Sequence, residues 1–396
     1  MPLPTAFHRR TSELCKSQEW LEWSGYLSAI TYGPTHDIEY SAIRNAAGLI
    51  DISPIYKYEI HGPDALALLN RIMTRDIGRC QIGQVMYSPW CNDDGKIIDD
   101  GTIARLDNDI FRVTAADPNL RWFQDCGYGM QAEVKDVSAK LAALALQGPN
   151  SREILKAISP GANWDELKYF RLLETEIGGI HVTVSRTGYT GDLGYELWIP
   201  AGHAEVVWDE LANAGSDYGM LAVGLAALDV ARLEAGLLLI EVDYISAHRA
   251  ITRSEEYSPY DLGLGWTVAR GKIGFVGQKR LRSEQQTGSL RRFIGLEVDW
   301  LSLRKLFEQA DLPPQVAGRT SRSGVPIYMN STQIGQATSM TFSPTLKKYI
   351  AIGTVDRPHG QVGSEVEVEI TVEYERKRAA ARIVKTPFFS PERKRA

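Results

Sequence analysis

A glycine-rich stretch at residues 186–200, RTGYTGDLGYELWIP, carries acidic and aromatic side chains at close spacing. The preceding HVTVSR and the final YELWIP both alternate apolar and polar residues, which predicts a turn between two strands. In the second strand the apolar residues share one face, so Glu196 and Trp198 lie together on the other. A carboxylate beside an aromatic plane could hold a flat heterocycle with N–H donors, or it could be a solvated edge.

Two adjacent carboxylates form the next candidate site. The segment VMYSPWCNDDGKIIDDGTIARL predicts a hairpin whose turn is NDDG, because Asn, Asp and Gly tolerate a tight reversal. Asp99 and Asp100 follow in its second strand and therefore point to opposite faces. They cannot share one task. One of them could stabilise positive charge or accept a proton, while the other could be a structural acid that ends the turn.

A third candidate is Arg232, within DVARLEAG. An arginine on a helix could bind a ligand carboxylate through the two-pronged geometry that lysine lacks. A salt bridge to Glu234 or Asp229 is an equal alternative.

The elements that position these residues are mixed helices and strands without a regular βαβ rhythm. Apolar residues three and four apart predict helices at 39–49, 62–72, 137–148, 205–215 and 224–237. From about Arg291 onward the chain reads as short strands separated by turn residues, which predicts a separate all-β C-terminal domain. The final PERKRA is expected to be frayed and solvated.

Length and composition narrow the function classes. A chain of 396 residues predicts two or three domains, and 44% apolar with 23% charged residues is typical of a soluble globular protein. A net charge of -5 argues against a nucleic-acid binder, and no apolar run is long enough for a membrane, so we expect a cytoplasmic protein. The four cysteines show no metal-ligand spacing, and we expect no metal site.

Taken in order along the chain, six motifs resemble the glycine cleavage T-protein family. They are NDDGKIIDDGTIARL, RTGYTGDLGYELWIP, GLAALDVARLEAGL, SPYDLGLGWTV with GFVGQKRL, IGQATSMTFSPTL and VKTPFF. The family also includes the folate domains of dimethylglycine and sarcosine oxidising enzymes, and tetrahydrofolate-dependent demethylases. The resemblance covers nearly the whole chain.

This resemblance implies an α+β fold of three domains arranged as a cloverleaf around a central folate hole. Two domains would be mixed α/β with antiparallel sheets, and the third an all-β barrel-like domain. We place domain 1 at residues 1–55 and 143–230, domain 2 at 56–142 and 231–285, and the C-terminal β domain at 286–396.

The resemblance also assigns roles to the candidate residues, with tetrahydrofolate as cofactor. Glu196 would bind the amino and ring N–H edge of the pteridine. Tyr189 would contact the folate, and Trp198 would either contact it or seal a domain interface. Asp100, rather than Asp99, matches the functional acid and would stabilise charge near the transferring carbon. Arg232 would bind the folate glutamate tail or a substrate carboxylate.

Departures from the family pattern favour its demethylase branch. Leu228 stands where T-proteins typically carry an arginine, and the segments WSGYLSAITYG and IDISPIYKY also differ. The predicted function is methyl transfer from a small methylated substrate to tetrahydrofolate. One alternative is a glycine-cleavage aminomethyltransferase, which would use an aminomethylated substrate on a lipoyl carrier protein. A second alternative is a folate-binding regulatory protein without activity.

Overall fold

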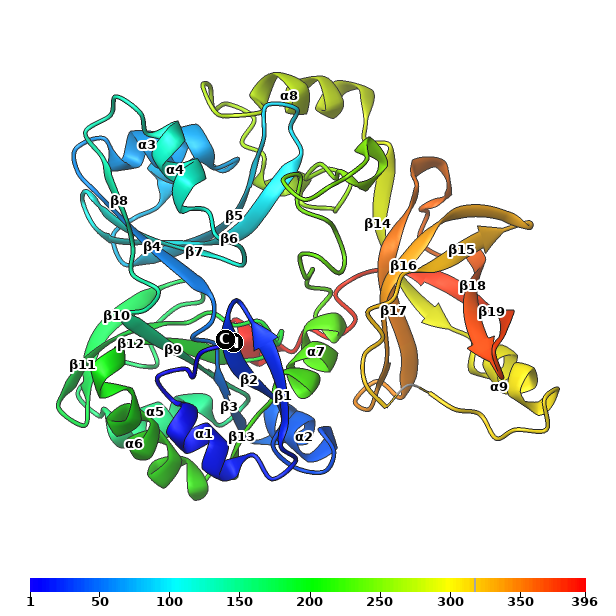
Figure 1. Ribbon diagram of the computed structural model, residues 1–396, viewed down its shortest axis with the longest axis horizontal. Coiled ribbons are helices and arrows are strands. Elements are labelled where there is room, and N and C mark those ends of the chain that lie inside the picture. Colours follow the sequence, from blue (N-terminus) through cyan, green and yellow to red (C-terminus); the bar gives the residue numbers. More distant parts are fainter. Residues whose placement is uncertain (317) are drawn as a thin grey trace.

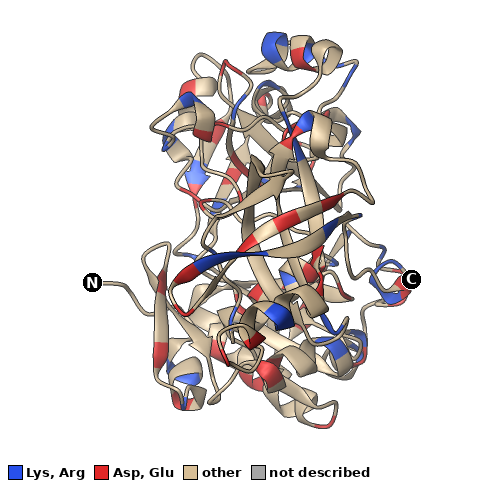
Figure 2. Cartoon of the chain, turned by 90° about the vertical axis from the view of Figure 1, so that its right-hand side faces the viewer, with Lys and Arg blue, Asp and Glu red and all other residues tan. Residues whose placement is uncertain are grey.

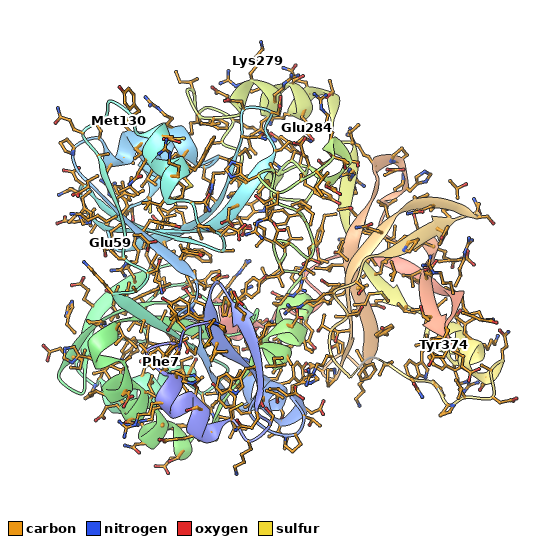
Figure 3. All side chains as sticks on the ribbon, viewed as in Figure 1. Phe7, Glu59, Met130, Lys279, Glu284 and Tyr374 are labelled. Carbon is orange, nitrogen blue, oxygen red and sulfur yellow. The ribbon has the colours of Figure 1, made fainter. Side chains whose placement is uncertain are left out.

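The computed structural model describes residues 1–316 and 318–396, which form three lobes around a common centre (Figure 1). Two lobes are mixed α/β units built on sheets, and the third is a closed barrel of six strands. Among the residues labelled in Figure 3, Phe7 lies in the first lobe, Met130 in the second and Tyr374 at the far end of the barrel. The expected α+β class and the barrel-like C-terminal region are confirmed.

The first sheet has six strands in the order β10-β11-β12-β9-β3-β13. Its neighbours are antiparallel except for β3 and β13, which are parallel. The strands are β3 (Ala47–Asp51), β9 (Leu141–Gln147), β10 (Leu172–Ile177), β11 (Ile180–Ser185), β12 (Gly194–Pro200) and β13 (Met220–Ala222). The first sheet therefore contains segments that precede the second sheet in the sequence and segments that follow it.

The second sheet has five antiparallel strands in the order β5-β6-β7-β4-β8. Its strands are β4 (Tyr56–His61), β5 (Gln84–Cys91), β6 (Ile97–Asp107), β7 (Ile110–Ala115) and β8 (Glu133–Asp136). The predicted hairpin is confirmed as β5–β6, and the Asn92 side chain accepts the backbone N–H groups of Asp94 and Lys96 within its turn. This hairpin carries both adjacent carboxylates.

The barrel closes in the order β14-β17-β16-β15-β18-β19, so it leaves no exposed sheet edge. Its strands are β14 (Arg291–Val298), β15 (Val325–Met329), β16 (Thr332–Ser343), β17 (Lys348–Asp356), β18 (Glu365–Val372) and β19 (Glu375–Val384). On its outer face, acidic residues of β18 pair with basic residues of β19, such as Glu367 with Arg378 (Figure 2).

Helices cover the two sheets and connect them to the barrel. They are α1 (His8–Leu14), α2 (Asp37–Asn45), α3 (Ala65–Ile72), α4 (Leu120–Cys126), α5 (Ser151–Ile158), α6 (Ala204–Ser216), α7 (Leu225–Glu234), α8 (Gln278–Thr287) and α9 (Trp300–Glu308). A hairpin of β1 (Glu19–Trp23) and β2 (Tyr26–Thr31) lies near the N-terminus. Within the described residues, no helix combines the length and apolar character needed to cross a membrane.

The helix predicted at 137–148 is wrong, because residues 141–147 form strand β9. The alanines and leucines there favour a helix by propensity alone. In the structure β9 lies between β12 and β3 and is buried on both faces, so its side chains pack as in a central strand. The helix predicted at 39–49 likewise ends at Asn45, and β3 follows.

Helix α2 supplies Arg44, which holds a buried network of charges together. Its guanidinium donates to Glu234 at the end of α7, with the shorter contact at 2.5 Å, and to Asp192 at 3.3 Å. Glu234 also accepts the hydroxyls of Tyr40 and of Ser343 in β16. The network therefore connects α2, α7, the glycine-rich turn and the barrel.

The C-terminal tail joins this network, which corrects the expectation that it is frayed. The Arg393 guanidinium contacts both oxygens of Asp192, at 2.6 and 2.9 Å, and donates to the Arg44 carbonyl at 3.1 Å. The Phe389 N–H donates to the Glu234 carbonyl at 2.8 Å. In Figure 1 the tail accordingly runs from the barrel back to the first lobe. The domain boundaries given above stay a prediction.

We predict that Gly101→Ala destabilises the fold, because a Cβ at this position would lie 1.9 Å from the Thr114 carbonyl oxygen in β7. Backbone cannot yield as a flexible side chain does, so we expect a loss of about 2–3 kcal/mol in the free energy of unfolding. Urea denaturation measures it. Gly161→Ala, which meets no atom within 4 Å, is the matched control. Equal stability of the two variants would show that β6 and β7 can separate.

Candidate functional site

The glycine-rich stretch joins β11 to β12, which pair antiparallel with Ser185 opposite Glu196. The predicted phase is confirmed, since Tyr195, Leu197 and Ile199 all belong to the core on one side of the sheet. Trp198 packs into a different core on the other side. Glu196 shares that second face, which is directed toward α7 and its neighbours.

The turn wraps closely around the side-chain amide of Gln147, a buried residue at the end of β9. A Cβ on Gly188 or Gly194 would lie 2.1 or 2.2 Å from this amide, so only glycine fits at either position. The amide accepts the Thr190 hydroxyl at 2.8 Å and donates to the Thr187 carbonyl at 3.3 Å. Gln147 therefore fixes the shape of the turn that carries Tyr189.

Glu196 is half-buried, and its carboxylate has one polar partner. Thr187 donates its hydroxyl to this carboxylate at 2.5 Å, and no salt bridge within residues 1–316 or 318–396 involves Glu196. Burial raises its pKa above the ordinary value, and the Thr187 hydrogen bond opposes that rise. A carboxylate without a salt-bridge partner can accept N–H donors from a ligand.

Tyr189 and Trp198 have different surroundings. The Tyr189 hydroxyl donates to the Leu238 carbonyl, and burial raises its pKa far above the ordinary value. Trp198 is only 7% exposed and packs within a hydrophobic core, where its indole N–H lies 3.3 Å from the Ser185 hydroxyl. This position favours the sealing role that the sequence left open for Trp198, and ligand contact by either residue stays a prediction.

Asp99 is a fully buried structural acid. Its two oxygens accept the backbone N–H of Asp100 at 2.7 Å, that of Asp117 at 2.9 Å and the Asn119 side-chain amide at 2.8 Å. Asn119 in turn accepts the Trp90 indole N–H at 3.0 Å. Asp99 thereby ties β6 to the segment that follows β7, and its hydrogen-bonding capacity is used within the protein.

Asp100 has an entirely different environment, made by two tyrosines. Tyr244, in the segment after α7, donates its hydroxyl to the Asp100 carboxylate, and the Tyr87 hydroxyl from β5 contacts the same group. Burial raises the pKa of Asp100, and both hydrogen bonds oppose this rise. Asp100 is half-buried, and a carboxylate with oriented donors can act on positive charge that develops beside it.

The two tyrosines were not identified from the sequence. A signal for Tyr87 existed, because in the hairpin it pairs with Thr102 and thus shares a face with Asp100. Tyr244 gave no local signal, since it lies 144 residues from Asp100 and is brought there by the packing of the loop after α7.

Arg232 is buried, and its N–H groups are occupied by the protein. It forms salt bridges to Asp229 at 2.7 Å and to Asp243 at 2.6 Å, and it donates to the Ser339 hydroxyl of the barrel at 2.8 Å. The salt bridge to Asp229 that the sequence offered as an alternative is present. A ligand contact by Arg232 stays a prediction that this geometry does not favour.

Three of the five predicted residues contact the segment that follows α7. Tyr189 and Arg232 donate to the adjacent carbonyls of Leu238 and Leu237, and Asp100 accepts the Tyr244 hydroxyl. Glu196 instead accepts the Thr187 hydroxyl. Among the described residues, no group of three or more His, Cys, Asp or Glu side chains could hold a metal ion. The candidate site is therefore a set of carboxylates and aromatic hydroxyls at the centre of the three lobes.

We predict that Tyr244→Phe raises the pKa of Asp100 further, because the lost hydroxyl stabilises the ionised carboxylate. Asp100 should then stay protonated to a higher pH than in the unchanged protein. Carbon-detected NMR of labelled aspartate, assigned by comparison with Asp100→Asn, follows this ionisation directly. Tyr374→Phe, at a fully exposed turn, is the control. Coincident titration curves would mean that the hydroxyl does not influence the carboxylate.

Known proteins are similar to this chain over most of its length. Residues 10–272 match the family described as "GCVT N-terminal domain", and residues 312–390 match "Glycine cleavage T-protein C-terminal barrel domain". An aminomethyltransferase of Halothermothrix orenii is 34% identical over 93% of this chain and 95% of that protein. The trimethylamine-oxide aldolase of Ruegeria pomeroyi is 33% identical over the whole chain, which spans 48% of that protein.

A solved structure extends the similarity to three dimensions. The glycine cleavage system aminomethyltransferase T from Bartonella henselae superposes with a TM-score of 0.83 at 26% identity, and the alignment covers 98% of this chain and 99% of that one. Both family matches lie in the order in which the sheets and the barrel occur. The chain therefore belongs to the glycine cleavage T-protein family of one-carbon transferases.

Proposed function

We propose that the protein transfers a methyl group from a small methylated substrate to tetrahydrofolate, as a demethylase does. The observation that carries this proposal is the Asp100 carboxylate, which is half-buried and accepts the Tyr244 hydroxyl, with the Tyr87 hydroxyl also in contact. The adjacent Asp99 accepts two backbone N–H groups and an amide, whereas the partners of Asp100 are tyrosine hydroxyls. Asp100 is suited to a reaction in which positive charge moves between a donor and an amine.

The residues present fit tetrahydrofolate. Glu196 has Thr187 as its polar partner and no salt bridge among the described residues, so it can accept the paired N–H donors of the pteridine edge. Tetrahydrofolate would supply the nucleophilic amine that receives the carbon. Thr187 and the turn around Gln147 would keep the Glu196 carboxylate in place for this contact.

The role of Asp100 follows from its surroundings. A carboxylate that is ionised can stabilise the positive charge that an amine gains when it bonds to a carbon. The hydroxyls of Tyr87 and Tyr244 keep its oxygens oriented before the reaction, so little reorganisation is needed. Asp100 can then accept the proton that the amine loses.

The proposed class of methyl donor follows from the lack of an unpaired arginine on helix α7. Leu228 contributes an aliphatic side chain where T-proteins typically have arginine, and Arg232 on the same helix is already paired with two carboxylates. Helix α7 therefore offers the centre no unpaired guanidinium. A donor whose methyl group is bonded to a sulfonium, a quaternary ammonium or a protonated ether fits this arrangement, because it carries its own positive charge and the leaving group departs as a neutral thioether, tertiary amine or alcohol.

A second candidate function is aminomethyl transfer within glycine cleavage. It is supported by relatives named aminomethyltransferase that match over nearly their whole length. In that case the carbon would arrive on the lipoyl group of a carrier protein and leave as methylene tetrahydrofolate. The roles of Glu196 and Asp100 would be the same in both reactions, so the reaction product distinguishes them.

We predict that Glu196→Ala weakens tetrahydrofolate binding more than it slows turnover at saturation. Loss of a charged, paired contact should cost about 1.5–3 kcal/mol, which corresponds to about tenfold or more in Kd. Isothermal titration calorimetry gives this constant. Glu166→Ala, an exposed acid on the same lobe, serves as the control. An unchanged Kd for the Glu196 variant would exclude the contact.

We also predict that Asp100→Asn keeps most of the folate affinity while it lowers kcat by about two to three orders of magnitude. The substitution preserves shape and removes charge. The assay incubates the protein and tetrahydrofolate with dimethylsulfoniopropionate, glycine betaine, a methoxylated aromatic acid or aminomethylated lipoyl carrier, and identifies the product by mass spectrometry.

Methyl tetrahydrofolate as the product supports the demethylase, and methylene tetrahydrofolate supports the aminomethyltransferase. Asp99→Asn provides no clean control, because that residue stabilises the fold. Asp311→Asn, at an exposed position, replaces it. Equal kcat for the Asp100 variant and this control would remove Asp100 from the mechanism.

A further inference from the structure

Trp266 lies beside the Asp100 site with its ring largely exposed. It belongs to a short 3₁₀ helix, η4 (Gly265–Thr267), and is 63% exposed. Its ring stacks on Tyr87, with centroids 6.2 Å apart and planes inclined by 28°. Because Tyr87 contacts the half-buried Asp100 carboxylate, the aromatic surface runs from this acid outward to solvent.

Arg75 covers the other end of this surface. It follows α3, and its guanidinium carbon lies 5.3 Å from the centroid of the Trp266 ring. Its one side-chain hydrogen bond within the described part of the chain runs to the Tyr87 carbonyl at 3.3 Å. No salt bridge among those residues includes it, and burial without a carboxylate partner lowers its pKa. An arginine so placed retains N–H donors for an anion.

The position of Arg75 is fixed by its backbone. Lys272 donates its ammonium to the Arg75 carbonyl at 2.6 Å, and the Arg75 N–H donates to the Ser88 hydroxyl at 3.3 Å. The nearby Arg79 is different, since its side chain is 82% exposed and pairs with Asp76. Arg75 is therefore a positioned cation on a rigid segment and not a solvated surface arm.

We propose that Arg75 and Trp266 form a carboxylate-binding subsite that continues outward from Asp100. Arg75 binds the carboxylate, and the Trp266 ring stacks on the planar or apolar group that links this carboxylate to the reacting end of the ligand. The assignment to tetrahydrofolate rests on the function proposed above. Its aminobenzoyl ring and glutamate follow the reacting amines in the same order as Asp100, Trp266 and Arg75. A carboxylated methyl donor presents the same chemistry.

Two folate probes separate the carboxylates from the rest of the molecule. The tetrahydropteroyl amide carries a neutral carboxamide where tetrahydrofolate carries its glutamate, so it has no carboxylate, and calorimetry on the full chain gives the Kd of each. We expect the unchanged protein to bind tetrahydrofolate more tightly. Arg75→Gln should weaken tetrahydrofolate about tenfold and leave the binding of the tetrahydropteroyl amide unchanged, because only the charge-assisted contact is lost. Trp266→Ala should weaken both probes.

Further variants guard against a general loss of structure. Arg75→Lys keeps the charge but not the paired donors and should recover part of the affinity. Arg79→Gln is the matched control and should match the unchanged protein. Thermal unfolding of each variant checks that the fold is retained.

The remaining outcomes are equally informative. If Arg75→Gln leaves the folate constants unchanged but raises KM for a carboxylated methyl donor at constant kcat, the subsite belongs to the donor. If Arg75→Gln changes neither the Kd of the folate probes nor the KM of the donor, or if it weakens the binding of both folate probes equally, the subsite is excluded. If the unchanged protein binds neither probe, the proposed function itself fails, and the assignment to folate fails with it.

Discussion

The buried guanidinium of Arg44 is the interaction on which the arrangement of the three lobes depends. It lies between two carboxylates, Asp192 of the glycine-rich turn and Glu234 of α7, and Glu234 extends the network to Ser343 of the barrel. Charges removed from water are tolerated only where their partners are complete, and removal of one partner typically costs about 3–5 kcal/mol. The network therefore holds the turn, the helix and the barrel in a single relative position, because any displacement would leave a charge unpaired in the interior.

Helix α7 transmits this constraint to the candidate site. Arg232, also on this helix, forms a salt bridge to Asp243. The Asp243 carboxylate also accepts the hydroxyls of Ser339 and Thr338 in the barrel, at 2.6 and 2.7 Å. The chain continues from Asp243 directly into Tyr244, which contacts Asp100. A second buried network thus fixes the segment after α7, which packs on the β5–β6 hairpin through Tyr244, relative to the barrel. The site has contributions from separate lobes, and its geometry is set by contacts that no ligand touches.

The sequence predicted those parts of the structure that local pattern determines. Strand alternation identified β11 and β12 and the face of Glu196, and turn residues identified the β5–β6 hairpin. The prediction failed at residues 141–147. Alanine and leucine favour a helix there, but the segment is buried between two strands and therefore forms a strand itself. The resemblance to a family supplied the lobes and the choice of Asp100. Three features depend on contacts between segments that are distant in the sequence, and a single sequence does not reveal such contacts. They are the tyrosines around Asp100, the pairing of the Arg232 guanidinium within the protein, and the absence of a carboxylate partner for Arg75 among the described residues.

The contact between Arg393 and Asp192 has a consequence for the order in which the protein folds. These residues are separated by 201 positions, so the ribosome adds the arginine long after the first sheet is complete. Until then Asp192 shares Arg44 with Glu234 and lacks its second cation. Contacts of such long sequence separation form late and slow the final step of folding. We therefore expect the nascent chain to carry a folded first sheet with an incompletely ordered turn, and to gain a competent site only in the last step of its maturation.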